Sequence, residues 1–400
     1  MKKIGLVILG IGVLLIGIIS FSKEEKKVLV EEEINNSNTS LVFMLQDEEG
    51  NCNKSEELPS SGYSFNTSKS VCSNNTTPTW EDNKLYLNNL SKNGTSCYLY
   101  FDVFSSAKNT ILSNSKVNEG TPDFSQVATT DEGIYKAEDD WGDSYYFRGA
   151  VNNNWVSFAG YYWRIIRING DGSIRMIYQG TSPTDNDTNA QIAKSYYNSN
   201  YYKSEYVGYM YTEEEQHGNT TNSDIKIVVD EWYNKYLINY ADYISKEAGF
   251  CGDREMADGS LWSSIESSHN YVAYERLVDN KTPILKCSNS SDLYTTSSSS
   301  KGNKKLINPI GLITADEVSM AGGVFGSNNN SYYLYNKEDY WTMSPSNFRS
   351  NLALVFYVRS YGDLNGTNVN NPIGIRPVIN IASNVAIKSG NGTSSEPYEI

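Results

Sequence analysis

The chain opens on a strongly hydrophobic stretch. Lys2 and Lys3 precede an uncharged run from Ile4 to Ser22, whose length lies where signal peptides and membrane-spanning helices overlap. By the positive-inside rule, the two lysines place the N-terminus in the cytoplasm, so the rest of the chain is exported. We therefore expect residues 1–22 to be a signal peptide or a hydrophobic anchor helix, and cleavage of this leader stays open.

Shorter hydrophobic patterns follow the leader. Residues 23–40 are charged and then polar, which indicates a stalk. Alternation of apolar and polar positions marks residues 41–104, where two alternating runs flank an Asn-Gly turn and Trp80 supplies one large core residue. This pattern predicts a small β-sandwich over 41–104. The polar residues 105–130 have weak periodicity and predict a linker.

Residues 131–400 predict one larger domain that begins with β-hairpins. The runs GYYWRIIRI and SIRMIYQG flank a turn at 169–172, and their apolar positions fall on shared faces. Three arginines interrupt these runs, namely Arg164, Arg167 and Arg175. Three alternatives stay open for them: they fan out on the exposed face, pair with carboxylates, or form an anion site.

Two helices and several strands complete the larger domain. Ser223 is a suitable N-cap for a helix over 224–237, which carries an apolar stripe at helical spacing. Thr314 and Glu317 form a capping box for a second helix that ends at Gly322 or Gly323. Strands are expected at 340–343, 353–360 and 374–381. The pattern predicts an α+β protein of mostly antiparallel β-structure with two helices.

Amino-acid composition and net charge limit the classes of partner that the protein can bind. The chain has a net charge of −14 and 31 tyrosines, and 39% of its residues are hydrophobic. Nucleic acid is excluded as the main partner, because phosphate binding needs clustered Lys and Arg. Abundant Tyr, Asn, Ser and Thr favour exposed β-structure and polar loops over a large helical core.

The five cysteines fit an exported chain with disulfides. We expect Cys72 to pair with Cys97 and Cys251 to pair with Cys287, although pairings that involve Cys52 stay open. Cys251 and Cys287 are a poor zinc site, because no histidine stands at ligand spacing.

Several motifs together carry a family resemblance. The segments SYYFRGAVNNNWVSFAGYYWRIIRINGDGSIRMIY, FCGDR, GLITADEV, YWTMSPSNF and GIRPVINI resemble exported proteins of Gram-positive gut bacteria with a C-terminal domain of unknown function. That family resembles the C-type-lectin-like fold of formylglycine-generating enzymes and of phage and bacterial variable receptor proteins. The resemblance covers 131–400 and implies a C-type-lectin-like domain there. The fold hosts both enzymes and binders, so it implies no single function.

Enzyme chemistry finds little support in the sequence. The formylglycine-generating enzymes use a cysteine pair late in their domain, and no cysteine follows Cys287 here, so that activity is not carried over. WGDSYY at 141–146 is similar to the nucleophile block of one lipase class. That chemistry needs a late histidine, and the two histidines are His217 and His269. We expect no catalytic residues.

Polar aromatic segments are the candidate binding surfaces. Residues 195–211 and 328–341 are rich in Tyr, Asn and Ser, a composition typical of paratopes. The resemblance adds the segments 344–351 and 361–371, which we expect to be loops. The candidate ligand-binding residues are Tyr196, Tyr197, Tyr201, Tyr202, Tyr332, Tyr333, Asn347 and Arg349.

We expect no cofactor. Calcium binding is possible. Asp185, Asp187 and Asn189 offer oxygen atoms at alternating positions, and a solvated loop is the default interpretation of the same residues.

The sequence predicts a cell-surface or secreted binding module, held by its N-terminal helix or released by cleavage. Its partner is a glycan or a surface protein, met through polar aromatic loops. The alternatives are a structural envelope protein without a discrete ligand and, less favoured, an enzyme. The ligand, calcium dependence and oligomeric state stay open.

Overall fold

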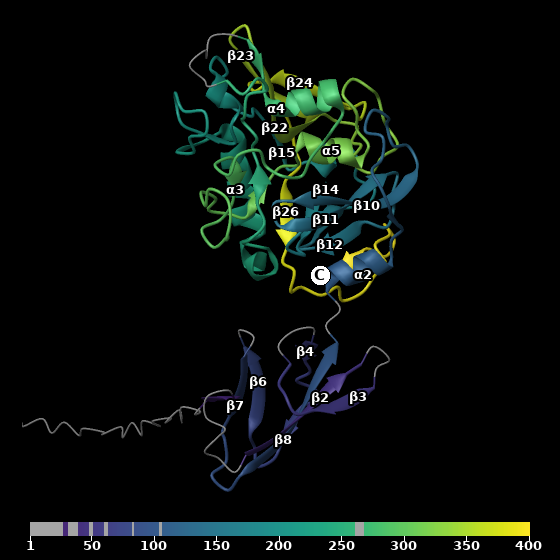
Figure 1. The fold of residues 1–400 in the computed structure, drawn as a ribbon, viewed down its shortest axis with the longest axis vertical. Coiled ribbons are helices and arrows are strands. Elements are labelled where there is room, and N and C mark those ends of the chain that lie inside the picture. The colour runs from purple at the N-terminus through teal and green to yellow at the C-terminus, as the bar shows by residue number, and fades with distance from the viewer. Residues whose placement is uncertain are drawn as a thin grey trace, which may run out of the picture. The chain divides into compact units, whose positions relative to one another are not determined.

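A computed structural model describes residues 27–30, 39–47, 51–59, 63–81, 84–103, 106–260 and 268–400. The chain divides into two compact units, Met1–Phe104 and Ser105–Ile400 (Figure 1). Both are built mostly of β-strands arranged in several sheets. Among the described residues, no helix has the length and hydrophobicity needed to cross a membrane. The predicted leader, 1–22, lies outside the described residues.

The first unit contains two sheets with one shared core. In the described part, the larger sheet consists of β3 (Cys52–Ser55), β2 (Thr39–Gln46), β8 (Thr95–Val103), β4 (Tyr63–Phe65) and β5 (Val71–Cys72). The smaller sheet consists of β1 (Lys27–Leu29), β7 (Lys84–Asn88) and β6 (Thr77–Glu81). Leu85 and Leu87 of β7 pack with Phe43 of β2 and with Leu99 and Phe101 of β8. This is the arrangement of a small β-sandwich.

Two sequence predictions for the first unit need correction. Lys27–Leu29, expected in a stalk, form β1 and pair with β7, with Val28 opposite Leu87. The two alternating runs around the Asn-Gly turn are strands, as predicted, but they belong to different sheets. The alternation of apolar and polar residues therefore identified the two strands, but it did not identify their partners: β7 pairs with β1 and β6, and β8 pairs with β2, β4 and β5.

The second unit is organised by two larger sheets. Within the described residues, the nine-stranded sheet follows the order β21 (Ile310–Gly311), β26 (Val378–Ile381), β14 (Ile174–Gly180), β13 (Tyr161–Ile168), β11 (Gly142–Gly149), β10 (Asp131–Asp139) and β9 (Val117–Asn118), with β12 (Trp155–Phe158) beside β13 and β27 (Tyr398–Glu399) beside β12. The six-stranded sheet follows the order β15 (Ala193–Ser195), β25 (Ile373–Ile375), β22 (Tyr340–Arg349), β23 (Leu352–Val358) and β24 (Leu364–Asn368), with β19 (His269–Asn270) beside β22.

Helices and short hairpins surround these sheets. The α-helices of this unit are α2 (Ala107–Ser113), α3 (Asp224–Tyr236), α4 (Val272–Tyr274) and α5 (Ala315–Ala321). The 3-10 helices cover Thr188–Ala190, Ser204–Val207 and Ile238–Tyr243, and a π-helix covers Glu275–Asn280. Two strand pairs complete the described part: β16 (Met210–Tyr211) with β17 (Thr221–Asn222), and β18 (Phe250–Cys251) with β20 (Leu293–Tyr294).

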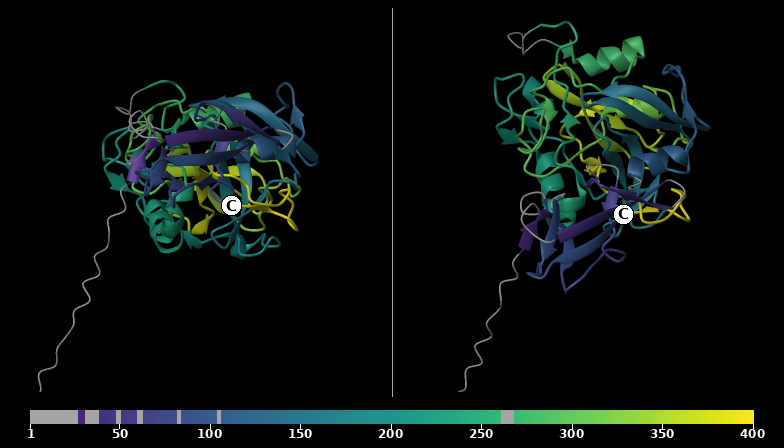
Figure 2. Two further views of the ribbon diagram at one scale, coloured as in Figure 1. Left: turned by 90° about the horizontal axis from the view of Figure 1, so that it is seen from below. Right: turned by 60° about the horizontal axis from the view of Figure 1, so that its bottom comes forward.

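Helix α5 joins the two large sheets. It contacts β11 of the nine-stranded sheet and β22, β23 and β24 of the six-stranded sheet (Figure 1). The predicted capping box is present, and Gly322 ends the helix with φ 116°. All seven helix residues are buried, so α5 lies inside the unit's continuous hydrophobic core. Two further views show the strands of this unit from other sides (Figure 2).

The segment 105–130 is part of the second unit and not a linker. Ser106 caps α2 by accepting a hydrogen bond from the backbone N–H of Asn109, and Ala107 and Ile111 enter the core. Strand β9 pairs in parallel with β10. A few apolar side chains at the right spacing are enough to dock this otherwise polar segment.

The opening hairpin is confirmed, although its surroundings differ from the expectation. Strands β13 and β14 pair as predicted around the turn at 169–172. Both faces of β14 are buried, and Arg164, Arg167 and Arg175 are buried as well. None of these three arginines therefore fans out on an exposed face.

Both expected disulfides are present. Cys72 pairs with Cys97 across β5 and β8, and Cys251 pairs with Cys287. Cys52 is a free cysteine of intermediate exposure.

Candidate functional site

The candidate site is a cavity of about 450 Å³ in the second unit. Its wall is formed by four parts of the chain: residues 150–155, the paired strands β13 and β14, the turn at 183–186, and residues 330–335. Both aromatic rings and short polar side chains line it. We call this space the aromatic cavity, and its rings belong to Trp155, Tyr332, Tyr333 and Tyr335.

Strand pairing brings the first two lining side chains together. Trp155 of β12 lies directly opposite Arg164 of β13 in the antiparallel ladder, so both side chains leave the same face. The guanidinium carbon of Arg164 lies 4.2 Å from the centre of the Trp155 ring and 5.3 Å from that of Tyr333. The arginine is thus held between two aromatic rings by cation–π contacts.

Hydrogen bonds fix Arg164 on one side only. Its Nε donates to Oδ1 of Asn154 at 2.7 Å, and its Nη2 donates to the same oxygen and to the carbonyl of Val151. Nη1 has no hydrogen-bond partner among the described residues, yet it is not a fully enclosed atom. Burial lowers the pKa of Arg164 to about 9, so the side chain is still a cation at pH 7.

A second buried arginine lies behind the cavity wall. Arg376 stands between β25 and β26, where the chain passes from one large sheet to the other. Its Nη2 donates to Oε1 of Gln179, which lines the aromatic cavity, and Nε and Nη1 donate to backbone carbonyls. Burial lowers the pKa of Arg376. Its positive charge, close to Arg164, adds to the effect of burial in lowering the pKa of Arg164.

The tyrosines of 328–341 form walls of the cavity. Tyr332 and Tyr333 are almost fully buried, and within the described residues neither hydroxyl has a hydrogen-bond partner. Tyr335 is half-buried. The segment is anchored because the Nδ2 of Asn329 donates to the carbonyls of Ala128 and Gly322. These two side-chain hydrogen bonds hold the start of the wall segment in place.

The candidates in 195–211 lie elsewhere and do not line the cavity. Tyr196, Tyr201 and Tyr202 are exposed, with Tyr202 the most exposed of the three at 52%. Tyr197 is fully buried, with its ring centre 5.6 Å from that of Trp341. Its prediction as a surface ligand contact is wrong, because its ring fills the core.

The segment 344–351, expected to be a loop, is largely strand. Asn347 and Arg349 both belong to β22. Asn347 is buried and lies opposite Asn270 of β19. Arg349 is exposed and lies 5.7 Å from the ring centre of Tyr274. The structure separates this pair from the aromatic cavity, because neither residue lines it.

The predicted calcium residues have local partners. Oδ2 of Asp185 accepts hydrogen bonds from the backbone N–H groups of Thr181 and Ser182, each at 2.9 Å. Oδ1 of Asp187 accepts from the backbone N–H of Asn189. These are turn and helix-cap contacts, and calcium binding stays a prediction.

One group of metal-type ligands occurs in the described part of the chain. Sulfur atoms of Cys251 and Cys287 and a carboxylate oxygen of Asp253 lie within 4.8 Å of one another. The two sulfurs form a disulfide, so they are not thiolates and this group does not fit a metal ion in the oxidised protein.

A buried ionic network supports the hairpin behind the site. Arg167 contacts Asp139 and Glu317, and Arg175 contacts the same Glu317 oxygen. Burial raises the pKa of Glu317, but the two cations and the N–H of Thr314 outweigh it, so the net pKa is lowered. For Arg167 and Arg175, pairing with carboxylates is the alternative that the structure shows.

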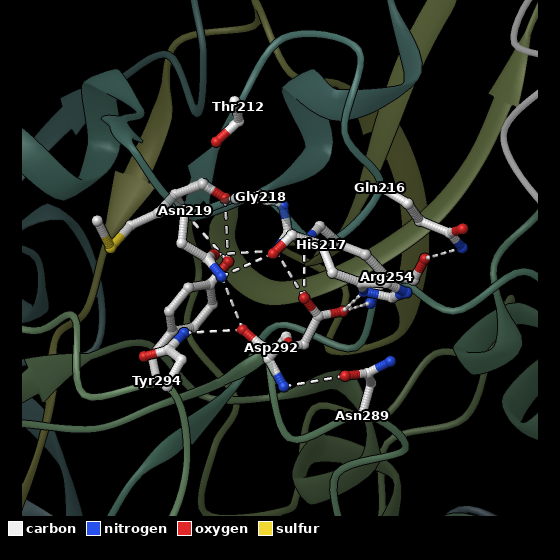
Figure 3. A network of polar contacts seen from close by, with 12 residues as sticks. Thr212, Gln216, His217, Gly218, Asn219, Arg254, Asn289, Asp292 and Tyr294 are labelled. Carbon is white, nitrogen blue, oxygen red and sulfur yellow. Dashed lines mark hydrogen bonds and ion pairs between the residues drawn. The ribbon is translucent and has the colours of Figure 1, made fainter.

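Asp292 forms a second polar network (Figure 3). Its buried carboxylate accepts hydrogen bonds from Nε and Nη2 of Arg254 and contacts Nδ1 of His217 at 3.0 Å. Nε2 of His217 lies 3.1 Å from a carboxylate oxygen of Glu255. Because both ring nitrogens already face carboxylates, His217 is not placed to activate a hydroxyl nucleophile. The network joins three loop segments through these contacts.

Comparison with known proteins gives no match. No protein-family model, curated protein or solved structure is similar to this chain. Functional arguments therefore rest on the geometry of the site.

Sequence reasoning found part of the aromatic cavity. Tyr332, Tyr333 and Asp185 were candidates, and all three line it. Tyr335 lies within the candidate segment 328–341 but was not singled out, and Trp155 was missed. The sequence feature that could have identified Trp155 is the short strand WVSF. It pairs with the strand that carries Arg164, and this pairing places the Trp155 ring beside the Arg164 guanidinium.

Proposed function

We propose that the protein is an exported, cell-surface binding module whose second unit has a C-type-lectin-like fold and binds a glycan in the aromatic cavity. The observation that carries the proposal is the cavity itself. Its volume, about 450 Å³, lies within the usual range for small-ligand sites. Its wall combines aromatic rings with polar side chains, which suits the apolar faces and the hydroxyl groups of a sugar.

The arrangement of the lining residues supports a glycan over a flat protein partner. Tyr335 is the half-buried ring among buried ones and offers a surface for stacking. Asn186, Asn330 and Ser331 supply donors and acceptors around it. A hollow of this size takes one or two sugar rings.

Export is supported by two features. The apolar run after Lys2 and Lys3 is suited to a signal or an anchor. The two disulfides are typical of proteins in an oxidising compartment. The competing proposal, a structural envelope protein, would require the aromatic cavity to have no ligand.

A glycan array tests the proposal. We expect full-length protein to bind a defined subset of glycans, and Tyr335→Ala to lower that binding about tenfold by removing the stacking ring. Tyr202→Ala is the matched control, since Tyr202 is an exposed tyrosine outside the cavity. Loss of binding with Tyr202→Ala alone would move the site to 195–211, and no binding to any glycan would contradict the proposed function.

A further inference from the structure

Buried arginines in this protein fall into two classes. Of the seven buried arginines in the described part of the chain, five form an ion pair with a carboxylate: Arg148, Arg167, Arg175, Arg254 and Arg276. The other two, Arg164 and Arg376, have no carboxylate partner among the described residues. A buried cation without a counter-charge is costly, so the exception calls for a physical explanation.

The two exceptions lie at one place. Arg164 lines the aromatic cavity, and Arg376 is bonded to the cavity residue Gln179. Arg376 is close enough to Arg164 for its positive charge to lower the pKa of Arg164. Two positive charges are thus concentrated beside a hollow that opens to solvent, in a chain with a net charge of −14.

The geometry also leaves one donor free. Nε and Nη2 of Arg164 are used by Asn154 and Val151, whereas Nη1 has no acceptor among the described residues. Arg164 is 6% exposed, and the side chain lines the cavity. A free N–H of a fixed guanidinium is a preferred partner for a carboxylate, because the hydrogen bond is charge-assisted and the donor is already oriented.

We propose that the aromatic cavity selects a sugar with a carboxylate group, such as a uronic or sialic acid, and that this carboxylate binds Nη1 of Arg164. The inference rests on the proposed glycan-binding function and adds the charge of the ligand. Arg167 and Arg175 of the same hairpin pair with carboxylates of the protein. For Arg164, the carboxylate of the ligand would supply the negative charge instead.

The one carboxylate among the residues that line the cavity does not supply this charge. Oδ2 of Asp185 is held by the backbone N–H groups of Thr181 and Ser182, and Asp185 forms no ion pair with Arg164. Asp185 would repel a ligand carboxylate placed beside it, so an acidic group can bind only in the part of the cavity away from Asp185.

Matched ester pairs test the inference. The methyl glycosides of galacturonic, glucuronic and N-acetylneuraminic acid are titrated into full-length protein, each beside its own methyl ester, which removes the charge and keeps the sugar. A 6-sulfated galactoside tests whether a sulfate ester can replace the carboxylate. We expect at least one acid to bind tenfold or more tightly than its ester.

Variants assign the preference to Arg164. Arg164→Gln is expected to bring the ratio between acid and ester close to one, whereas Arg349→Gln, which removes one exposed positive charge outside the cavity, leaves it unchanged. If Arg164→Gln does not fold, the ester ratio and the larger rise in Tm with the acid still test selection of the carboxylate in the unaltered protein. A crystal structure with that acid then shows whether its carboxylate lies at Nη1 of Arg164, and a carboxylate bound elsewhere would overturn the assignment.

The outcomes separate the two proposals. Equal binding of acids and esters would overturn the carboxylate inference and leave glycan binding intact. Binding of the sulfated sugar alone would also overturn it, in favour of a sulfate ester. Absence of binding by every sugar, together with an empty glycan array, would contradict both.

Discussion

At the scale of single residues, the buried hydroxyl group of Tyr333 gives a testable prediction about stability. Tyr333 is 6% exposed, and its hydroxyl has no partner among the described residues. A buried polar group without a hydrogen bond costs free energy, so Tyr333→Phe removes a penalty and keeps the ring beside Arg164. We expect the free energy of unfolding to stay the same or rise by about 1 kcal/mol, as measured by denaturant titration.

Tyr271 provides the control for this prediction. It is also fully buried, but its hydroxyl donates to the carbonyl of Ser204 at 2.8 Å. Tyr271→Phe removes this buried hydrogen bond and is expected to lower the free energy of unfolding by about 1 kcal/mol. If Tyr333→Phe were as destabilising as Tyr271→Phe, the Tyr333 hydroxyl would have a partner in the free protein, and this view of the cavity wall would be wrong.

At the scale of elements, Glu317 connects α5 to the hairpin β13–β14. Its carboxylate caps the helix through the N–H of Thr314 and pairs with Arg167 and Arg175. Glu317→Gln breaks a buried ionic group and is expected to lower the free energy of unfolding by about 3–5 kcal/mol at pH 7. Glu338→Gln is the control, because Glu338 forms an exposed pair with Lys194 whose loss should cost about 0–1 kcal/mol.

The same carboxylate predicts a pH dependence with a definite sign. The pKa of Glu317 in the folded protein is below its ordinary value of 4.5. Its contribution to stability is therefore present above that value and is lost as the pH falls through the folded-state pKa. Unfolding measured between pH 5 and pH 3 should show a steeper loss for the unaltered protein than for Glu317→Gln. Equal slopes would contradict the role of Glu317.

Elements defined by local sequence were predictable. The capping box of Thr314 and Glu317 and the hairpin around 169–172 depend on neighbouring residues, and both are confirmed. The run 374–381 was expected as one strand but forms β25 and β26 in different sheets. Pro377 lacks an N–H for a sheet ladder, so the chain can leave one sheet there and join the other.

The candidate site was less predictable because burial depends on distant parts of the chain. Tyrosine-rich composition identified Tyr332 and Tyr333, which line the cavity, and equally Tyr197, which is fully buried. The Tyr333 ring beside Arg164 and the Glu317 carboxylate that pairs with Arg167 both come from segments far along the chain from the hairpin. Composition alone could not show which arginine would lack a carboxylate.

At the scale of the whole molecule, the net charge opposes the proposed preference for an acidic sugar. A net charge of −14 disfavours the approach of an acidic sugar over long distances. Salt screens exposed charges beyond about 8 Å at physiological ionic strength, whereas a buried contact is screened much less. The proposed selection of an acidic ligand would therefore depend on the short contact at Arg164.

The most direct test of the central claim is a crystal structure of the full-length protein with the tightest-binding glycan from the array. We expect the sugar to lie in the aromatic cavity, with one ring stacked on Tyr335 and its carboxylate at Nη1 of Arg164. A sugar bound on 195–211, with the aromatic cavity holding none, would contradict it.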